Sequence, residues 1–120
     1  MSVELLKAYS QAWNDHDIDA IMTFMADDCV FLTGGGSEHY GTKHAGFDEV
    51  KARFIEVWES IPDVRFVQDQ HFAQGDRGCS QWIFTGTAAD GQAIEISGVD
   101  LFTFKDGKIS IKDSYIKNRS

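Results

Sequence analysis

The 120-residue chain contains a single proline, only two cysteines and no long apolar run. Cys29 and Cys79 have no CxxC or Cys/His spacing, which argues against a disulfide framework and against a zinc site. No apolar stretch approaches the roughly 20 residues of a membrane-spanning helix, and no secretory leader precedes the first helical pattern. We therefore expect one soluble cytoplasmic domain over residues 1–120.

Positive charge is also scarce. Eleven basic residues against nineteen acidic ones give a formal net charge of -8, the wrong sign for holding nucleic-acid phosphates or anionic lipid. The four histidines share no metal-ligand spacing. We expect no nucleic-acid partner, no membrane partner, no metal and no cofactor.

Helical periodicity dominates the first half of the sequence. Apolar side chains recur at helical spacing over residues 3–14, over a shorter segment that begins after Asp17 and ends near Ala26, and over residues 47–61 before Pro62. The glycine-rich segment 34–45 between them is expected to form a loop.

The second half alternates with a period of two residues. Strands are predicted near 64–72, 79–87, 92–104 and 109–117, in addition to a strand at 29–33. Helices followed by strands indicate an α+β domain, in which three N-terminal helices cover a curved antiparallel sheet shaped like a cone.

Two aspartates fall on the apolar faces of their predicted strands. If the turn at 105–108 sets a regular register, Asp100 and Asp113 lie opposite each other. A one-residue bulge would bring Phe102 and Phe104 level with Ser110 and Lys112, and the hydrophobic pattern argues against that arrangement. Facing carboxylates on an apolar face would raise the pKa of at least one of them, as in acid–base sites.

The alternative for this pair is that one aspartate reaches a wet sheet edge and pairs with a lysine or arginine. Gln81 and Cys79 are predicted on the same face as Asp100. Gln81 is either a ligand contact or a satisfied strand residue, and Cys79 is expected to be a core residue.

Aromatic residues from separate elements can line a cavity beneath the curved sheet. Tyr9 is the one whose hydroxyl needs a polar partner, for which a neutral Asp100 is the candidate. The predicted substrate-binding residues are Trp13, Phe24, Phe31, Thr33, His39, Tyr40, Trp58, Gln81 and Trp82.

Several segments together resemble the nuclear-transport-factor-2-like (NTF2-like) superfamily, which includes ketosteroid isomerases, SnoaL-like polyketide cyclases and limonene epoxide hydrolases. The resemblance spans nearly the whole chain. It rests on YSQAWN at 9–14, DIDAI at 17–21, MADDCV at 25–30, Gly41, WIFTGT at 82–87 and GVDLFTFKDGKI at 98–109.

The resemblance implies roles for individual positions. Tyr9 and Asp100 match the oxyanion-hole residues of the isomerases, and Asp113 matches the last-strand acid or base of the hydrolases and cyclases. Thr33 occupies the position of the isomerase general base, and Cys79 and Gln81 fall near the hydrolase Arg and Asp.

These matches favour a cofactor-independent, SnoaL-like enzyme. It would transfer a proton on a hydrophobic polyketide-, steroid- or terpenoid-like carbonyl compound, by isomerisation, aldol-type cyclisation or hydrolysis, with Asp113, Asp100 and Tyr9 as catalytic residues. The alternative is a non-catalytic ligand-binding or assembly domain. The resemblance also implies a homodimer through the sheet face that carries Ser97, Val99, Leu101 and Thr103.

Overall fold

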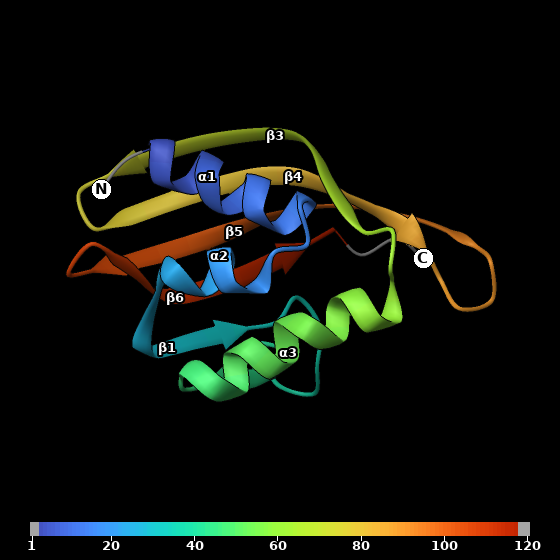
Figure 1. The fold of residues 1–120 in the computed structure, drawn as a ribbon, viewed down its shortest axis with the longest axis horizontal. Coiled ribbons are helices and arrows are strands. Elements are labelled where there is room, and N and C mark those ends of the chain that lie inside the picture. Colours follow the sequence, from blue (N-terminus) through green and yellow to red (C-terminus); the bar gives the residue numbers. More distant parts are fainter. Residues whose placement is uncertain (1–2, 118–120) are drawn as a thin grey trace.

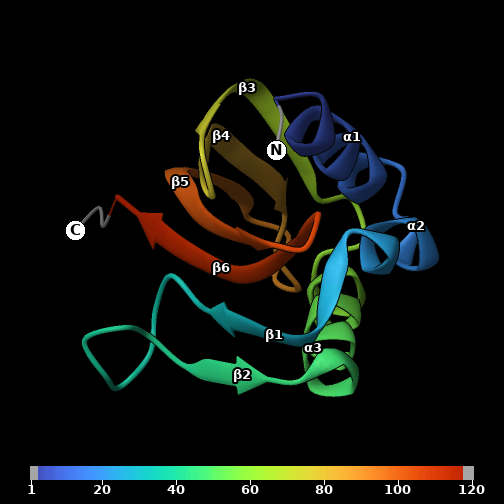
Figure 2. The same ribbon diagram turned by 90° about the vertical axis from the view of Figure 1, so that its left-hand side faces the viewer.

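Three helices pack against one side of a curved, unclosed six-stranded sheet (Figures 1 and 2). The computed structural model describes residues 3–117, so the ends of the predicted domain, 1–2 and 118–120, lie outside the described part. The helices are α1 (Val3–Asn14), α2 (Ile18–Thr23) and α3 (Phe47–Ser60). The strands are β1 (Met25–Leu32), β2 (Lys43–Ala45), β3 (Arg65–Gln74), β4 (Arg77–Thr87), β5 (Ala93–Lys105) and β6 (Lys108–Ile116).

The strands lie side by side in the order β2-β1-β6-β5-β4-β3. β1 runs parallel to β6, and the other four neighbouring pairs are antiparallel. The predicted α+β class and curved sheet are confirmed, and the expectation of a wholly antiparallel sheet is wrong for the β1–β6 pair.

The helices form where apolar side chains repeat at three and four residues. In α1, Leu6, Tyr9 and Trp13 are buried, and in α3 Val50 and Phe54 are fully buried. Asp17 caps α2 by accepting a hydrogen bond from the Ala20 amide at 3.1 Å. α1 covers β3 and β4 while α3 covers β1, which places the core between the helices and the concave side of the sheet.

Two local expectations differ from the structure. The second helix ends at Thr23, because the chain extends from Met25 into β1, which starts earlier than the predicted strand at 29–33. Residues 43–45, expected in a loop, pair with Val30–Leu32 as the short strand β2.

The predicted register of β4 on β5 is wrong by one residue. The connecting loop has five residues, 88–92, because Thr87 pairs with Ala93. Ser80 therefore lies opposite Asp100, while Cys79 and Gln81 lie opposite Leu101 and Val99. Because adjacent strand residues point to opposite faces, this single step moves Gln81 away from Asp100.

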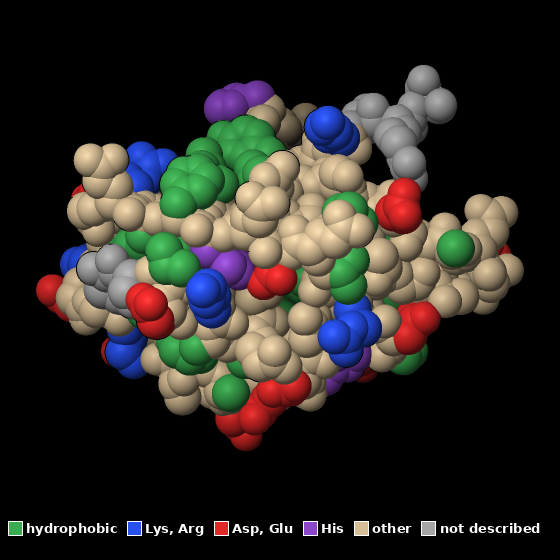
Figure 3. Space-filling model, turned by 90° about the horizontal axis from the view of Figure 1, so that it is seen from above, with side chains coloured by type: hydrophobic (Ala, Val, Ile, Leu, Met, Phe, Trp, Pro, Cys, Tyr) green, Lys and Arg blue, Asp and Glu red, His purple; other side chains and the backbone are tan. Residues whose placement is uncertain are grey.

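Some large hydrophobic side chains remain on the surface. Phe72 is 65% exposed and Tyr115 is 53% exposed. In the view from above, a group of hydrophobic side chains lies among scattered charges (Figure 3). The homodimer through the outer face of β5 stays a prediction.

Gly98 allows β5 to pass close to its neighbours. A Cβ atom at this position would approach the Tyr115 carbonyl oxygen and lie 2.8 Å from the Trp82 ring. We expect Gly98→Ala to lower the free energy of unfolding by about 1–3 kcal/mol through overpacking, as measured by urea denaturation. The control is Gly35→Ala, where nothing lies within 4 Å of the added atom, and a change beyond about 0.5 kcal/mol is not expected there. Equal effects at both glycines would contradict this packing account.

Candidate functional site

A β-bulge in β6 determines which side chains enter the concave face. Phe104 pairs with Ile109, but Thr103 pairs with Ile111, so Ser110 is the extra residue. Its hydroxyl donates to the Thr103 carbonyl at 3.1 Å. The bulge brings Lys112 level with Phe102 on the inner face.

The predicted carboxylate pair is therefore wrong. Asp100 lies opposite Ser114, and Asp113 lies opposite Leu101. Asp113 is half-buried on the outer side of the strand, where the Tyr115 hydroxyl donates to its carboxylate at 3.2 Å. Asp113 is absent from the lining of the cavity described below, and its catalytic role stays a prediction.

Lys112 lies at the centre of the site, although a lysine is rarely buried. It is only 3% exposed. Its ammonium nitrogen lies 4.7–5.4 Å from the centroids of four aromatic rings, those of Tyr9, Trp13, Phe31 and Phe54. Ring faces attract a cation, and such contacts strengthen when the cation is shielded from water. Three elements that are distant in sequence, α1, β1 and α3, thus supply one aromatic cage.

Asp100 balances the charge of Lys112. The Lys112 Nζ atom lies 3.7 Å from Asp100 Oδ2. The same oxygen accepts a hydrogen bond from Trp82 Nε1 at 3.0 Å, and Asp100 Oδ1 accepts one from the Ser114 hydroxyl. The carboxylate is therefore buried but hydrogen-bonded, as buried charges need to be.

Tyr9 completes this buried group. Lys112 Nζ donates to the Tyr9 hydroxyl at 3.1 Å, so the polar partner of the phenol is Lys112 rather than the expected Asp100. Burial raises the pKa of Tyr9, although the positive charge of Lys112 opposes that rise. Burial by itself would lower the pKa of Lys112, but the Asp100 carboxylate and the Tyr9 phenol outweigh it, so the net pKa is raised. Lys112 therefore stays charged inside an apolar shell.

The buried pair faces a cavity of about 450 Å³. Lys112, Asp100 and Ser114 supply polar groups to walls that are largely apolar. The apolar lining residues are Trp13, Phe31, Val57, Ile61, Phe66, Trp82, Phe84, Ile96 and Ile116. A volume of this size suits a small organic molecule.

The structure brings together only part of the predicted site. Asp100, Trp13, Phe31, Thr33 and Trp82 line the cavity. Tyr9 lies behind Lys112, beside a small void of about 10 Å³ that it shares with Ser80 and Asp100.

The remaining predicted residues are not among the cavity-lining residues. Phe24 packs edge-on against Tyr9 at 6.2 Å, and Trp58 packs between Trp13 and His16. His39 and Tyr40 contact each other in the exposed loop after β1. Gln81 lines a separate groove with Val99 and Tyr115 on the outer face of the sheet.

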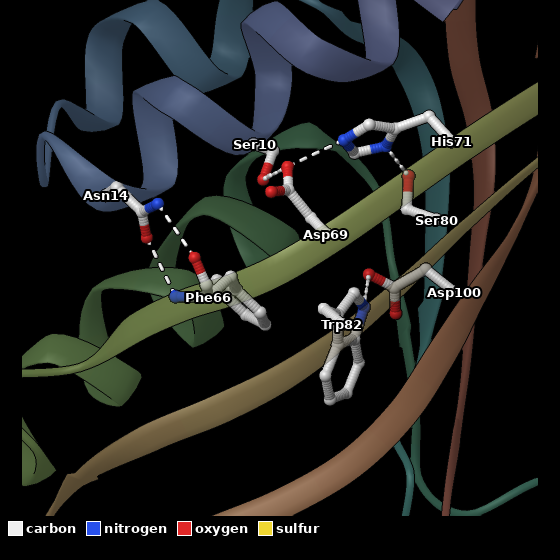
Figure 4. Close-up of polar contacts among 8 residues, drawn as sticks. All are labelled: Ser10, Asn14, Phe66, Asp69, His71, Ser80, Trp82 and Asp100. Carbon is white, nitrogen blue, oxygen red and sulfur yellow. Dashed lines mark hydrogen bonds and ion pairs between the residues drawn. The ribbon is translucent and has the colours of Figure 1, made fainter.

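A second polar chain lies between α1 and the sheet (Figure 4). His71 Nε2 lies 2.7 Å from Asp69 Oδ2, and His71 Nδ1 lies 2.7 Å from the Ser80 hydroxyl. Ser10 also donates to Asp69 at 3.2 Å. Burial would raise the pKa of Asp69, but the hydrogen bonds, chiefly from His71, lower it overall. These contacts satisfy a buried imidazole, whose side chain is 2% exposed.

Sequence reasoning missed Lys112 and Ser114. The hydrophobic pattern argued against a bulge, and only the one extra residue in β6 moves Lys112 to the face of Asp100. Within residues 3–117, no group of three or more His, Cys, Asp or Glu side chains is arranged to hold a metal ion. No helix in that range is long and apolar enough to cross a membrane.

Comparison with known proteins identifies the family. The model of the SnoaL-like domain matches residues 6–111, which is most of the chain. The chain belongs to the SnoaL-like domain family. No curated protein sequence matches it.

Solved structures share the fold of this SnoaL-like domain. A proposed polyketide cyclase from Xanthomonas campestris pv. campestris is 22% identical, with a TM-score of 0.84 over 96% of this chain and 88% of that chain. A proposed polyketide cyclase from Pseudomonas putida is 21% identical, with a TM-score of 0.82 over 96% of this chain and 90% of that one. TerC, crystallised with polyporic acid, is 22% identical, with a TM-score of 0.81 over 96% and 90% of the two chains. At these identities the likeness establishes the fold alone.

The buried pair can be tested through stability. Removing one charge leaves the other buried without its partner, which costs about 3–5 kcal/mol. We expect Lys112→Met and Asp100→Asn each to lose stability on that scale, and the double variant to lose at least about 1 kcal/mol less than the sum. Urea denaturation of all four proteins measures the coupling.

The exposed pair Lys105–Asp28, 3.5 Å apart, is the matched control. Lys105→Met should change stability by no more than about 1 kcal/mol, because water already solvates both groups. Additive effects of Lys112→Met and Asp100→Asn would contradict the description of these two residues as a coupled buried pair.

Proposed function

We propose that this SnoaL-like protein transfers a proton on a hydrophobic, polyketide-, steroid- or terpenoid-like carbonyl compound. The observation that carries the proposal is a single ion pair, Asp100 with Lys112, in the wall of an apolar cavity. An isomerisation, an aldol-type cyclisation and a hydrolysis all need a base beside a group that stabilises a developing oxyanion.

In the proposed reaction the substrate carbonyl oxygen faces Lys112. Asp100 removes a proton from the carbon next to the carbonyl, the C–H electron pair forms the enolate double bond, and negative charge moves to the oxygen. The Lys112 ammonium stabilises this oxygen in a site that excludes water, where electrostatic attraction is stronger than in solution. The protonated Asp100 then returns the proton to another carbon, or, after the enolate carbon has attacked a second carbonyl, to the alkoxide that this attack forms.

Tyr9 acts in this scheme as a positioning residue. Its hydroxyl accepts from Lys112 and so fixes the direction of the ammonium group. Thr33 lines the cavity, but its hydroxyl already donates to Gly35 O and accepts from the Thr42 amide. Among the described lining residues, Asp100 carries the one carboxylate, which favours it as the base.

A non-catalytic ligand-binding or assembly domain is the second candidate. The observation in its favour is that both Asp100 oxygens already accept hydrogen bonds, from Trp82 and Ser114. In this candidate the carboxylate only neutralises Lys112, and Lys112 binds an acceptor group of a ligand without proton transfer.

The two candidates differ in their reaction with 5-nitrobenzisoxazole. A carboxylate base removes its ring C–H proton, the N–O bond breaks, and a coloured cyanonitrophenolate forms. We expect the wild-type protein to accelerate this reaction and Asp100→Asn to lower kcat/KM by at least about 100-fold. Lys112→Met should lower it by about 10- to 1,000-fold, because the phenolate loses its cation.

Asp113→Asn is the matched control, since it makes the same chemical change on the outer side of β6. It should retain the rate of the wild-type protein, and circular dichroism of each variant checks that it remains folded. If Asp113→Asn loses the rate while Asp100→Asn keeps it, the assignment of the base is overturned. A folded wild-type protein that binds the probe without turnover would favour the binding domain.

A further inference from the structure

A second cation, Arg53, lines the same cavity. It lies on α3 one turn before Val57, and Ser60 and Ile61 follow at the end of the helix. Residues four and seven or eight apart share one side of a helix. The stripe of α3 that faces the cavity thus carries a guanidinium group in line with apolar side chains.

The two cations lie at different depths. The Lys112 side chain is 4% exposed, whereas that of Arg53 is 33% exposed. Gly34 and Gly35, which also line the cavity, are exposed. Lys112 therefore belongs to the closed end of the cavity and Arg53 to its rim, with apolar walls between them.

Arg53 has unused hydrogen-bonding capacity. Its Nη1 atom lies 3.3 Å from Glu56 Oε2 on the same helix, and the Glu56 side chain is 62% exposed. A pair this exposed contributes little and is readily replaced. A guanidinium has five N–H donors, and within residues 3–117 Glu56 is the partner that Arg53 engages.

The charge of the cavity is opposite to that of the protein. The chain as a whole has a formal net charge of -8. The charged side chains among the described lining residues are Asp100, Lys112 and Arg53, two cations and one anion. Asp100 is paired with Lys112, whereas Glu56, the partner of Arg53, is exposed and lies outside the cavity lining, so a ligand carboxylate can replace it.

We propose that the cavity selects hydrophobic carbonyl compounds that carry a carboxylate at the end remote from the reacting group. Arg53 is the specificity-determining residue, because its planar guanidinium matches a carboxylate in a two-point contact. This inference rests on the proposed function, in which the carbonyl or enolate oxygen of the ligand lies at Lys112. It adds that the substrate is an acid rather than a neutral ketone.

Two probes of the same shape test the inference. 2-Naphthol has a hydroxyl for Lys112 and an apolar body, and 6-hydroxy-2-naphthoic acid adds a carboxylate at the opposite end. Isothermal titration calorimetry at pH 7 should show that the acid binds about tenfold more tightly than 2-naphthol, the scale of one charge-assisted hydrogen bond at a partly exposed site. Arg53→Met, which keeps an unbranched apolar chain, should abolish the preference for the acid while 2-naphthol still binds.

Lys51→Met is the matched control. Lys51 is on the same helix, lies 4.0 Å from Asp19 and does not belong to the cavity lining. Its substitution changes the net charge by the same amount, so an unchanged preference separates a local contact from a general effect of charge. Glu56→Gln should increase the preference, because it releases Arg53.

The outcomes separate the two proposals. If 2-naphthol binds and the acid binds no more tightly, or if Arg53→Met and Lys51→Met have equal effects, the inference about Arg53 is overturned and the proposed function stands. If neither compound binds, the cavity does not accept such ligands, and both proposals fail.

Discussion

A buried ammonium group governs this structure. Moving an ammonium ion from water into a protein interior costs several kcal/mol even after the protein relaxes. The Lys112 charge is offset by Asp100 at 3.7 Å, by the Tyr9 hydroxyl at 3.1 Å and by four aromatic ring faces. No single one of these contacts comes from a neighbouring residue in the chain. The cage exists only when α1, α3, β1, β5 and β6 are assembled.

The rest of the site follows from this requirement. The bulge at Ser110 turns Lys112 inward, and the Trp82 indole and the Ser114 hydroxyl hold the carboxylate that neutralises it. Gly98 lets the Trp82 ring lie close to β5, where it can reach Asp100. The ion pair of Lys112 and Asp100 thus lies inside a hydrophobic core. The cavity beside it has a fixed cation and a fixed carboxylate, and the proposed scheme uses no bound cofactor. Such preorganised charge is the feature that the proposed proton transfer uses.

The sequence predicted the three helices and every strand except β2, but it did not predict the arrangement of the site. Helical periodicity is local, so the spacing of Leu6, Tyr9 and Trp13 predicts α1 without any knowledge of its partners. The face that each strand residue takes depends on pairing, and one extra residue reverses it. Because the loop before β5 has five residues, Ser80 rather than Gln81 lies opposite Asp100. Because of the bulge, Lys112 rather than Asp113 lies on the inner face. The hydrophobic pattern of β6 argues against burying Lys112. The aromatic rings that offset its charge lie far away in the sequence, so the pattern of one strand does not reveal them.

The pKa of the Lys112 ammonium tests the central claim most directly. It can be followed by NMR through the chemical shift of the carbon next to Nζ, with Lys112→Met for assignment and Asp100→Asn as a variant that removes the partner charge. The account predicts a pKa above the ordinary value of about 10.4 in the wild-type protein and a lower one in Asp100→Asn. At pH values below that ordinary pKa, the charged Lys112 would then contribute its full stabilisation of the folded state. This contribution would be lost as the pH rises through the folded-state pKa. A pKa below the ordinary value in the wild-type protein would mean that burial outweighs its partners, and would contradict a charged Lys112 at the centre of the site.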